Sequence, residues 1–577
     1  MIRKLIGAAP ACVVTCLSCL SAYTAPAYTA TAVAVTQRPT LIVAISVDQF
    51  SAGVFDQYRD RFKGGLRRMI DEGVVFPNGY QSHAATETCP GHSTLLTGKH
   101  PSGTGIIANE WLEPGGQNMY CVSDPSVSVP GRPNAPRGPA NLRVSTLGEW
   151  LKSHDPASRV IAVSGKDRAA INMSGHNPDA VFWWDDELGF NTYVHAGEDP
   201  RDRLAPVKDF NEAVAQRWSK ALPTWTPLDK SCARLNSEGT YDGTWHISHH
   251  VPPNWHLNDK TQPFRQDRAF KSWVRASPIV DELSLELAKS LLTRYKLGRG
   301  TAPDLLAISL SATDYVGHRY GNEGPEMCDQ LAHLDRGLGA FFASLDALKF
   351  RYIVVLSADH GAVDVAERVQ QRGFPAQRIT VDVSMSVNSY LRGLDSDSKA
   401  GPGFKVDFDA FKFESNGLYF LGRNIAPEQR QSIINIAVKY LNQQPWVARS
   451  FSKDDILRVQ VRPDIAPDEL TLEERFAESV DAERSADVLI AFKPYSTLDH
   501  IDPAGNYIAG HGSPWNYDRR VPILFWRPGI QGYEQYLPIE TVDIAPTLAA
   551  VLGVPHPAVD GRCIDLDRGA GSTCPVD

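Results

Sequence analysis

Three apolar runs of this sequence are each followed by an aspartate, and two of these aspartates have a histidine close behind them. The residues are Asp48 after the run 41–47, Asp314 and His318 after the run 304–310, and Asp359 and His360 after the run 352–356. Near-continuous apolar runs are typical of strands that are buried on both faces, as in a parallel sheet. Because parallel strands end at one edge, we expect these side chains to meet in the crevice where open α/β sheets bind ligands.

A further histidine, His511, lies in the glycine-rich loop 509–514, where the backbone can approach a ligand closely. Buried carboxylates and imidazoles that converge in this way cannot all remain without a partner. A bound cation is the simplest partner, and mixed aspartate and histidine ligands are typical of Zn²⁺. Each histidine alone would more often be structural, so the prediction of a metal site depends on the repeated position at strand ends.

The stretch 86–98 has the features of a helix start. Pro90 suits the first helical turn, the segment 93–97 is expected to be helical, and Gly98 is expected to end it. Thr88 then lies at or just before a helix N-terminus, where backbone N–H groups and the helix dipole favour an anion. A hydroxyl held there beside a metal could attack phosphorus or carbonyl carbon. The alternative is that Thr88 only caps the helix, the commonest role of threonine at such a position.

Two cations, Lys166 and Arg168, follow the predicted strand 159–163. Residues two apart on a strand share a face, so both side chains could point at one anion. Arginine offers a planar fork for phosphate oxygens, and lysine offers a point charge. The alternative is a solvated pair on the surface.

Other segments supply the rest of the sheet and the helices that cover it. Strands are predicted at 159–163, 486–491 and 521–526, and helices with one apolar stripe at 277–298 and 326–348. Strands that alternate with helices predict an α/β fold, with a doubly wound and mostly parallel sheet flanked by helices.

Insertions interrupt this core and define the predicted domains. The core is expected over 38–362 and again over 486–577, where it carries His511. The first insertion is a long loop at about 113–142. The second, at about 182–276, is rich in Trp, Asp and Pro with little periodicity, and it should lie beside the site. The third is an α+β cap subdomain at 363–485 with a helix at 427–443.

The N-terminus predicts export to the periplasm or the medium. Arg3 and Lys4 precede an apolar stretch over 5–20 and several small-residue cleavage sites, so 1–32 is expected to be a signal peptide. A transmembrane anchor is the alternative, but the apolar stretch is short and contains Pro10.

Six cysteines remain after this segment, and an even number in an exported protein is compatible with disulfides. They are Cys89, Cys121, Cys232, Cys328, Cys563 and Cys574. Many pairings are possible, and Cys563 with Cys574 is the most local one. The net charge of −9 argues against a nucleic acid or an anionic membrane as the main partner.

Taken together, these residues resemble the alkaline phosphatase superfamily over most of the chain outside the insertions. The run Thr-Cys-Pro-Gly-His at 88–92 looks like the threonine nucleophile motif of its nucleotide pyrophosphatase/phosphodiesterase branch. A sulfatase would need a Cys or Ser nucleophile followed by Pro and Arg at set offsets, and this stretch lacks that arginine. The resemblance implies an alkaline-phosphatase-like fold and two Zn²⁺ per chain, one held by Asp48, Asp359, His360 and Thr88, the other by Asp314, His318 and His511. It also implies that Asn109 binds a phosphate oxygen.

Lys166 and Arg168 discriminate within that branch. The chain is similar to the PafA-type alkaline phosphatases, in which a lysine and an arginine bind the remaining phosphate oxygens. A phosphate monoester is a dianion, so an extra cationic pair favours it over the monoanion of a diester. The resemblance also implies that the lysine ammonium takes the role of Mg²⁺ in other alkaline phosphatases, so no catalytic Mg²⁺ is expected.

The expected function is therefore that of a monomeric alkaline phosphatase that hydrolyses a broad range of small phosphate monoesters through a phospho-Thr88 intermediate. The nearest alternative is a nucleotide pyrophosphatase/phosphodiesterase with the same two-zinc site. A different class of alternative is a catalytically silent protein that binds metal or phosphate and uses Thr88 only as a helix cap.

Overall fold

The computed structural model describes residues 38–241, 245–253, 264–394, 405–415, 417–498, 507–568 and 573–574. The predicted signal peptide, 1–32, lies outside the described residues. Within the described ranges, every helix is too short or too polar to cross a membrane.

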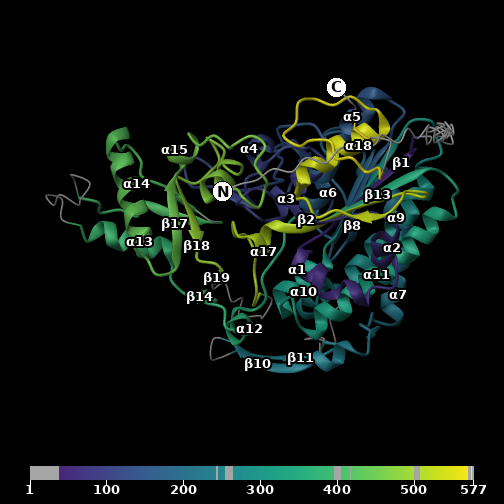
Figure 1. Cartoon of the computed structure of the whole chain (residues 1–577), viewed down its shortest axis with the longest axis horizontal. Helices are drawn as coiled ribbons and strands as arrows, with labels where there is room; N and C mark the ends of the chain where they lie inside the picture. Colours follow the sequence, from purple (N-terminus) through teal and green to yellow (C-terminus); the bar gives the residue numbers. More distant parts are fainter. Residues whose placement is uncertain are drawn as a thin grey trace, which may run out of the picture. The chain divides into compact units, whose positions relative to one another are not determined.

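A large, mostly parallel sheet forms the centre of the fold (Figure 1). Its strand order is β21-β2-β20-β13-β1-β12-β6-β7-β8, and β22 also pairs with β2. The strands are β1 (Leu41–Val47), β2 (Val74–Tyr80), β6 (Val160–Ser164), β7 (Ala180–Asp185), β8 (Gly189–Asn191), β12 (Asp304–Leu310), β13 (Tyr352–Ser357), β20 (Arg520–Trp526), β21 (Tyr533–Glu534) and β22 (Ile539–Glu540). The neighbours β13, β1, β12, β6 and β7 are parallel, and β20 is antiparallel to β13 and β2. The predicted fold class is confirmed.

Strand β1 illustrates why the central runs are apolar throughout. Leu41, Val43 and Ile45 pack into one hydrophobic core, whereas Ile42 and Ala44 pack into a second core on the other face. Figure 1 shows helices on both sides of the sheet. The helices α2 (Gly65–Glu72), α9 (Ile279–Arg294) and α11 (Pro325–Asp346) contribute to the first core, and α5 (Leu147–His154), α6 (Asp167–Ser174) and α18 (Ile544–Leu552) contribute to the second. The two helices predicted at 277–298 and 326–348 correspond to α9 and α11.

One predicted strand belongs to a different sheet. The sequence predicts the segment 486–491 in the central sheet, but β18 (Val488–Phe492) pairs with β16 (Gly417–Phe420) and β17 (Val447–Ser452). Together with β15 (Phe411–Glu414) they form a separate four-stranded sheet. Val488 and Ile490 pack into the core of this smaller sheet, while Leu489 and Ala491 pack into the second main core. Because β18 is buried on both faces, its sequence looks like that of a central strand.

The insertions also differ in part from the prediction. The segment 182–276 contains the helix α7 (Pro200–Lys220), whose buried residues are Val207, Val214 and Trp218. The helix is largely exposed, so its apolar stripe is too sparse to give a clear period. The segment 113–142 is mostly irregular, as expected, with the short strands β4 (Asn118–Tyr120) and β5 (Val127–Ser128). The helix predicted at 427–443 is α14 (Pro427–Leu441).

The described part of the chain contains three disulfides, Cys89–Cys121, Cys232–Cys328 and Cys563–Cys574. The predicted local pair, Cys563 with Cys574, is confirmed.

Candidate active site

The three aspartates lie at the carboxyl ends of adjacent strands. Strand β1 pairs in parallel with both β12 and β13, so the ends of the three strands are level. Asp48 follows β1 directly, Asp359 lies two residues after β13, and Asp314 lies in the first turn of α10 (Ala312–Tyr320) after β12. All three side chains are buried. The convergence predicted from the apolar runs is confirmed.

Two groups of acids and imidazoles form at this edge. In the first, His360 Nε2 lies 3.3 Å from Asp359 Oδ2 and 3.6 Å from Asp48 Oδ1. In the second, His318 Nε2 and His511 Nε2 lie 3.3 Å and 3.5 Å from Asp314 Oδ1. The rings of His360 and His511 stack with centroids 3.7 Å apart, so the two groups are neighbours. Within each group, one potential ligand atom from every residue lies within 4.8 Å of the others.

The histidines are oriented as metal ligands would be. Each Nδ1 bonds to a backbone carbonyl, and this leaves Nε2 directed at the carboxylates. The Nδ1–oxygen distances are 2.8 Å for His318 to Ala509, 2.9 Å for His360 to Gly361, and 2.8 Å for His511 to Thr86. Burial lowers the pKa of His360 to about 3, which keeps its ring neutral.

Several polar atoms of these groups are buried without a hydrogen bond. Among the described residues they include Asp48 Oδ1, Asp314 Oδ1 and His360 Nε2. Burial and the charge of Asp359 raise the pKa of Asp48, so the ionised cluster is costly on its own. Cations held by each group would satisfy these atoms, and mixed carboxylate and imidazole donors match the preference of Zn²⁺. The residues therefore fit two metal ions.

Thr88 begins a helix, but the helix differs from the predicted one. Helix α3 runs from Thr88 to Leu95 rather than over 93–97, and its N-cap is Glu87. The alternative role of Thr88 as the cap is therefore wrong. Thr88 Oγ1 lies 3.4 Å from Lys166 Nζ and 3.3 Å from Arg168 Nη2. Its hydroxyl thus faces two cations at the positive end of a helix.

Lys166 and Arg168 converge for a different reason from the one predicted. They do not extend a strand, because β6 ends at Ser164, and Lys166 is the N-cap of α6 while Arg168 lies in its first turn. Lys166 is buried, with Nζ 2.7 Å from Asp48 Oδ2 and 2.5 Å from Asp314 Oδ2. Burial alone would lower the pKa of Lys166, but the charges of these two aspartates raise it, so the ammonium stays protonated. A solvated surface lysine is excluded.

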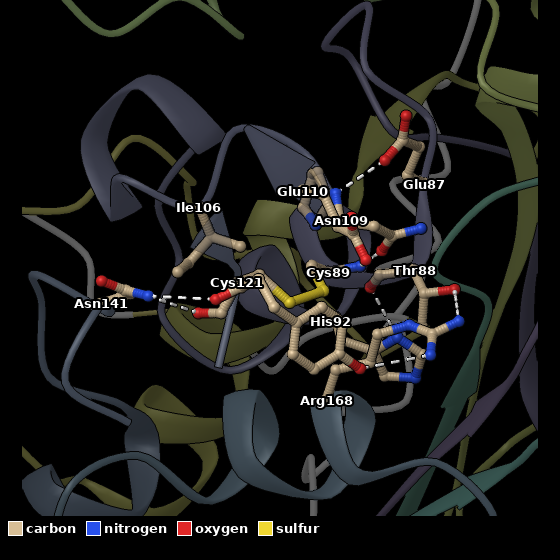
Figure 2. Close-up of a disulfide and its surroundings, with 12 residues drawn as sticks. Glu87, Thr88, Cys89, His92, Ile106, Asn109, Glu110, Cys121, Asn141 and Arg168 are labelled. Carbon is tan, nitrogen blue, oxygen red and sulfur yellow. Dashed lines mark hydrogen bonds between the residues drawn. A yellow bond between two sulfur atoms is a disulfide. The ribbon is translucent and has the colours of Figure 1, made fainter. Parts of the chain in front are cut away.

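Asn109 lies beside the start of α3, where Figure 2 shows it with Thr88 and Arg168. Its Oδ1 accepts a hydrogen bond from the N–H of Cys89 at 2.9 Å, so its NH₂ group is the donor available to a ligand. Its own N–H donates to Glu87 Oε2 at 2.7 Å.

A cavity of about 460 Å³ opens in front of these residues. This volume suits a small-molecule site. Its lining includes Thr88, Asn109, Arg168, Asp314, His318 and His511. The structure therefore brings all ten predicted site residues to one place, and the remaining four, Asp48, Asp359, His360 and Lys166, are buried.

Two residues besides these ten support the site. His92 lies one turn after Thr88 in α3, and its Nδ1 is 2.9 Å from the Thr88 carbonyl oxygen and 3.0 Å from Asp359 Oδ2. Gly91 packs so tightly that a Cβ added there would lie 1.9 Å from the Asp359 carbonyl oxygen. Glycine in the middle of a short helix lowers the stability of the helix. Its presence at position 91 was therefore the available indication that another segment of backbone packs closely against α3.

Replacement of Gly91 by alanine should therefore destabilise the fold and displace Asp359. We expect the free energy of unfolding to fall by about 3 kcal/mol because the new methyl group meets backbone rather than a mobile side chain. Urea denaturation followed by circular dichroism measures this change. The matched control is Gly53→Ala in the helix α1 (Ala52–Tyr58), where the nearest atom would be 3.7 Å away. That variant should be as stable as the parent or more stable by up to about 1 kcal/mol, and equal stabilities of the two variants would contradict the packing argument.

The comparisons with known proteins agree on one family. The model of the type I phosphodiesterase/nucleotide pyrophosphatase family matches residues 42–500. Alkaline phosphatase PhoD of Zymomonas mobilis is 40% identical over 545 residues, covering 93% of this chain and 89% of the relative. Alkaline phosphatase PhoK of a Sphingomonas species is 40% identical over 543 residues, covering 93% and 92%. The crystal structure of alkaline phosphatase PafA superposes with a TM-score of 0.76 at 27% identity, covering 91% of this chain and 98% of that one. The resemblance stated from the motifs is confirmed.

Proposed function

This chain belongs to the type I phosphodiesterase/nucleotide pyrophosphatase family, whose members hydrolyse phosphoesters, and we propose that it is an alkaline phosphatase acting on phosphate monoesters. The observation that carries the proposal is the position of Lys166 and Arg168, whose cationic groups both lie within hydrogen-bonding range of the Thr88 hydroxyl. The names of the relatives PhoD and PhoK support the same activity.

The proposed site would hold two Zn²⁺. Asp48, Asp359, His360 and Thr88 would bind one, and Asp314, His318 and His511 would bind the other. When bound, the pair would lower the pKa of the Thr88 hydroxyl and stabilise charge on the departing ester oxygen.

The protein residues supply the remaining steps. Thr88 Oγ1 attacks phosphorus in line with the leaving alcohol, the P–O ester bond breaks, and phospho-Thr88 forms. Asn109, Lys166 and Arg168 stabilise the charge on the non-bridging oxygens. Water then attacks phosphorus and gives up a proton, the Oγ1–P bond breaks, and Thr88 regains its hydroxyl proton as inorganic phosphate leaves. Because the site binds phosphate and not the alcohol, many leaving groups should be accepted.

The preference for monoesters follows from charge. A monoester dianion has three non-bridging oxygens for the cations, whereas a diester monoanion has two and carries a second substituent. The test compares kcat/KM for p-nitrophenyl phosphate and methyl p-nitrophenyl phosphate with the purified enzyme. The proposal requires a higher value for the monoester, and a higher value for the diester would indicate a phosphodiesterase instead.

Removal of metal should abolish activity reversibly. We expect about two zinc atoms per chain by plasma mass spectrometry, and near-complete loss of both zinc and turnover after dialysis against a chelator. Zn²⁺ should restore activity, and Mg²⁺ alone should not. The variant Asp314→Asn should retain about one zinc atom, because only the second group loses a carboxylate. An unchanged zinc content in this variant would show that the metals are bound elsewhere.

We also propose that the enzyme works in the periplasm or outside the cell, as a monomer. The three disulfides support an oxidising compartment.

A further inference from the structure

The start of α3 is tied to the segment that carries Asn109 by a disulfide and two hydrogen bonds (Figure 2). Cys89 follows Thr88 directly and is bonded to Cys121, and both cysteines are buried. Cys121 also donates its N–H to the carbonyl oxygen of Asn109 at 2.9 Å. The positions of the nucleophile and of residues 109–121 are therefore coupled through covalent and hydrogen bonds.

Tyr120, which precedes Cys121, contacts Arg168. It ends β4, which pairs with β3 (Glu110–Leu112). Its hydroxyl donates to Asp167 Oδ1 at 2.7 Å and accepts from Arg168 Nη1 at 3.4 Å. Burial, followed by the charge of Asp167, raises the pKa of Tyr120, so the hydroxyl stays protonated and can keep both roles.

Arg137 fixes this arrangement from the other side. Its Nε lies 3.1 Å from Asp167 Oδ2, and its guanidinium carbon lies 4.5 Å from the centre of the Tyr120 ring. Tyr120 thus contacts two arginines, Arg137 at its ring and Arg168 at its hydroxyl. Within the described ranges, the guanidinium of Arg168 hydrogen-bonds to two oxygens, Thr88 Oγ1 and Tyr120 Oη. Tyr120 is therefore the partner, besides the nucleophile Thr88, that orients the guanidinium of Arg168.

We propose that Tyr120 is a positioning residue that directs Arg168 toward the phosphoryl group, and that the Cys89–Cys121 disulfide holds the strand that carries it. The inference rests on the proposed function, in which Arg168 binds a non-bridging oxygen. Because the guanidinium of arginine is planar, the strength with which it binds phosphate depends on its orientation. Loss of the contact between the Tyr120 hydroxyl and Arg168 should therefore weaken catalysis although the charge of Arg168 remains.

The first test is a double-mutant cycle between Tyr120→Phe and Arg168→Ala, with p-nitrophenyl phosphate as substrate. We expect Tyr120→Phe to lower kcat/KM about tenfold in the parent and less than about twofold in the Arg168→Ala background, because the tyrosine acts through the arginine. Equal losses in both backgrounds, or no loss in the parent, would overturn the proposal. If Arg168→Ala alone left the monoester rate unchanged, the proposed function itself would fail, and this outcome is separate from the coupling.

The second test removes the disulfide. The double variant Cys89→Ala/Cys121→Ala should lose about tenfold in kcat/KM, and most of this loss should disappear in the Arg168→Ala background. The matched control is Cys563→Ala/Cys574→Ala, which removes a disulfide far along the chain and should keep activity within about twofold. Equal losses in the two disulfide variants, or full activity in the first, would contradict the positioning role. Tyr120→Phe removes only one oxygen atom, so the first test decides the tyrosine's role even if the cysteine variant does not fold.

Discussion

Replacement of Thr88 by alanine is expected to lower kcat/KM for phosphate monoesters by about 10³-fold or more. Alanine leaves the other proposed metal ligands and both cations in place but removes the atom that the proposed mechanism uses for attack. The hydroxyl lies 3.4 Å from Lys166 Nζ and 3.3 Å from Arg168 Nη2. Alanine therefore removes the oxygen atom that both cationic groups contact. Initial rates with p-nitrophenyl phosphate measure the effect.

Thr88→Ser is the matched control, because it keeps the hydroxyl and removes one methyl group. It should retain activity within about tenfold of the parent, with unchanged zinc content. A folded, zinc-loaded Thr88→Ala variant with parental activity would rule out the nucleophile. A Thr88→Ser variant as inactive as Thr88→Ala would mean that the threonine acts through its packing.

Replacement of Lys166 by alanine should reduce monoester hydrolysis far more than diester hydrolysis. We expect kcat/KM for p-nitrophenyl phosphate to fall about 10²- to 10³-fold, the range for losing one charge-stabilising group, and the value for methyl p-nitrophenyl phosphate to fall less than about tenfold. The reason is that the buried ammonium, 3.4 Å from Thr88 Oγ1, adds positive charge at the point of attack, which stabilises the dianion more than the monoanion.

Two controls accompany this variant. Its zinc content should be measured, because Lys166 also pairs with Asp48 and Asp314. Lys271→Ala, which removes a lysine that pairs with Glu187 at the surface, should leave both rates unchanged. Equal losses for the monoester and the diester in Lys166→Ala would show that the lysine supports the site as a whole and does not select the dianion.

The sequence predicts this site well where burial dictates the residue types. The runs that precede Asp48, Asp314 and Asp359 are apolar on both faces because β1, β12 and β13 lie between two cores. Parallel pairing then brings their carboxyl ends together, and any aspartate placed there must meet its neighbours. The convergence of these aspartates could therefore be predicted from their positions along the chain, whereas the division of the ligands into two candidate metal-binding groups was implied by the family resemblance.

The sequence predicts less where contacts between distant segments decide the structure. Strand β18 packs into two cores, as a central strand does, so its burial pattern does not reveal which sheet it joins. The pairing of Cys89 with Cys121 also depends on the course of an irregular segment, and no periodicity specifies it. The contact between Tyr120 and Arg168 follows from that same course, so this support for the site became evident only in three dimensions.

The central claim is that Thr88 carries the phosphoryl group during turnover. Its most direct test is mass spectrometry of peptides from enzyme quenched in acid while it hydrolyses p-nitrophenyl phosphate at saturating concentration. The account predicts one added phosphoryl group on the peptide that contains Thr88, located on that residue by fragmentation and absent from Thr88→Ala. A phosphoryl group on a different residue, or an unmodified Thr88 peptide under conditions in which breakdown of the intermediate limits the rate, would contradict it.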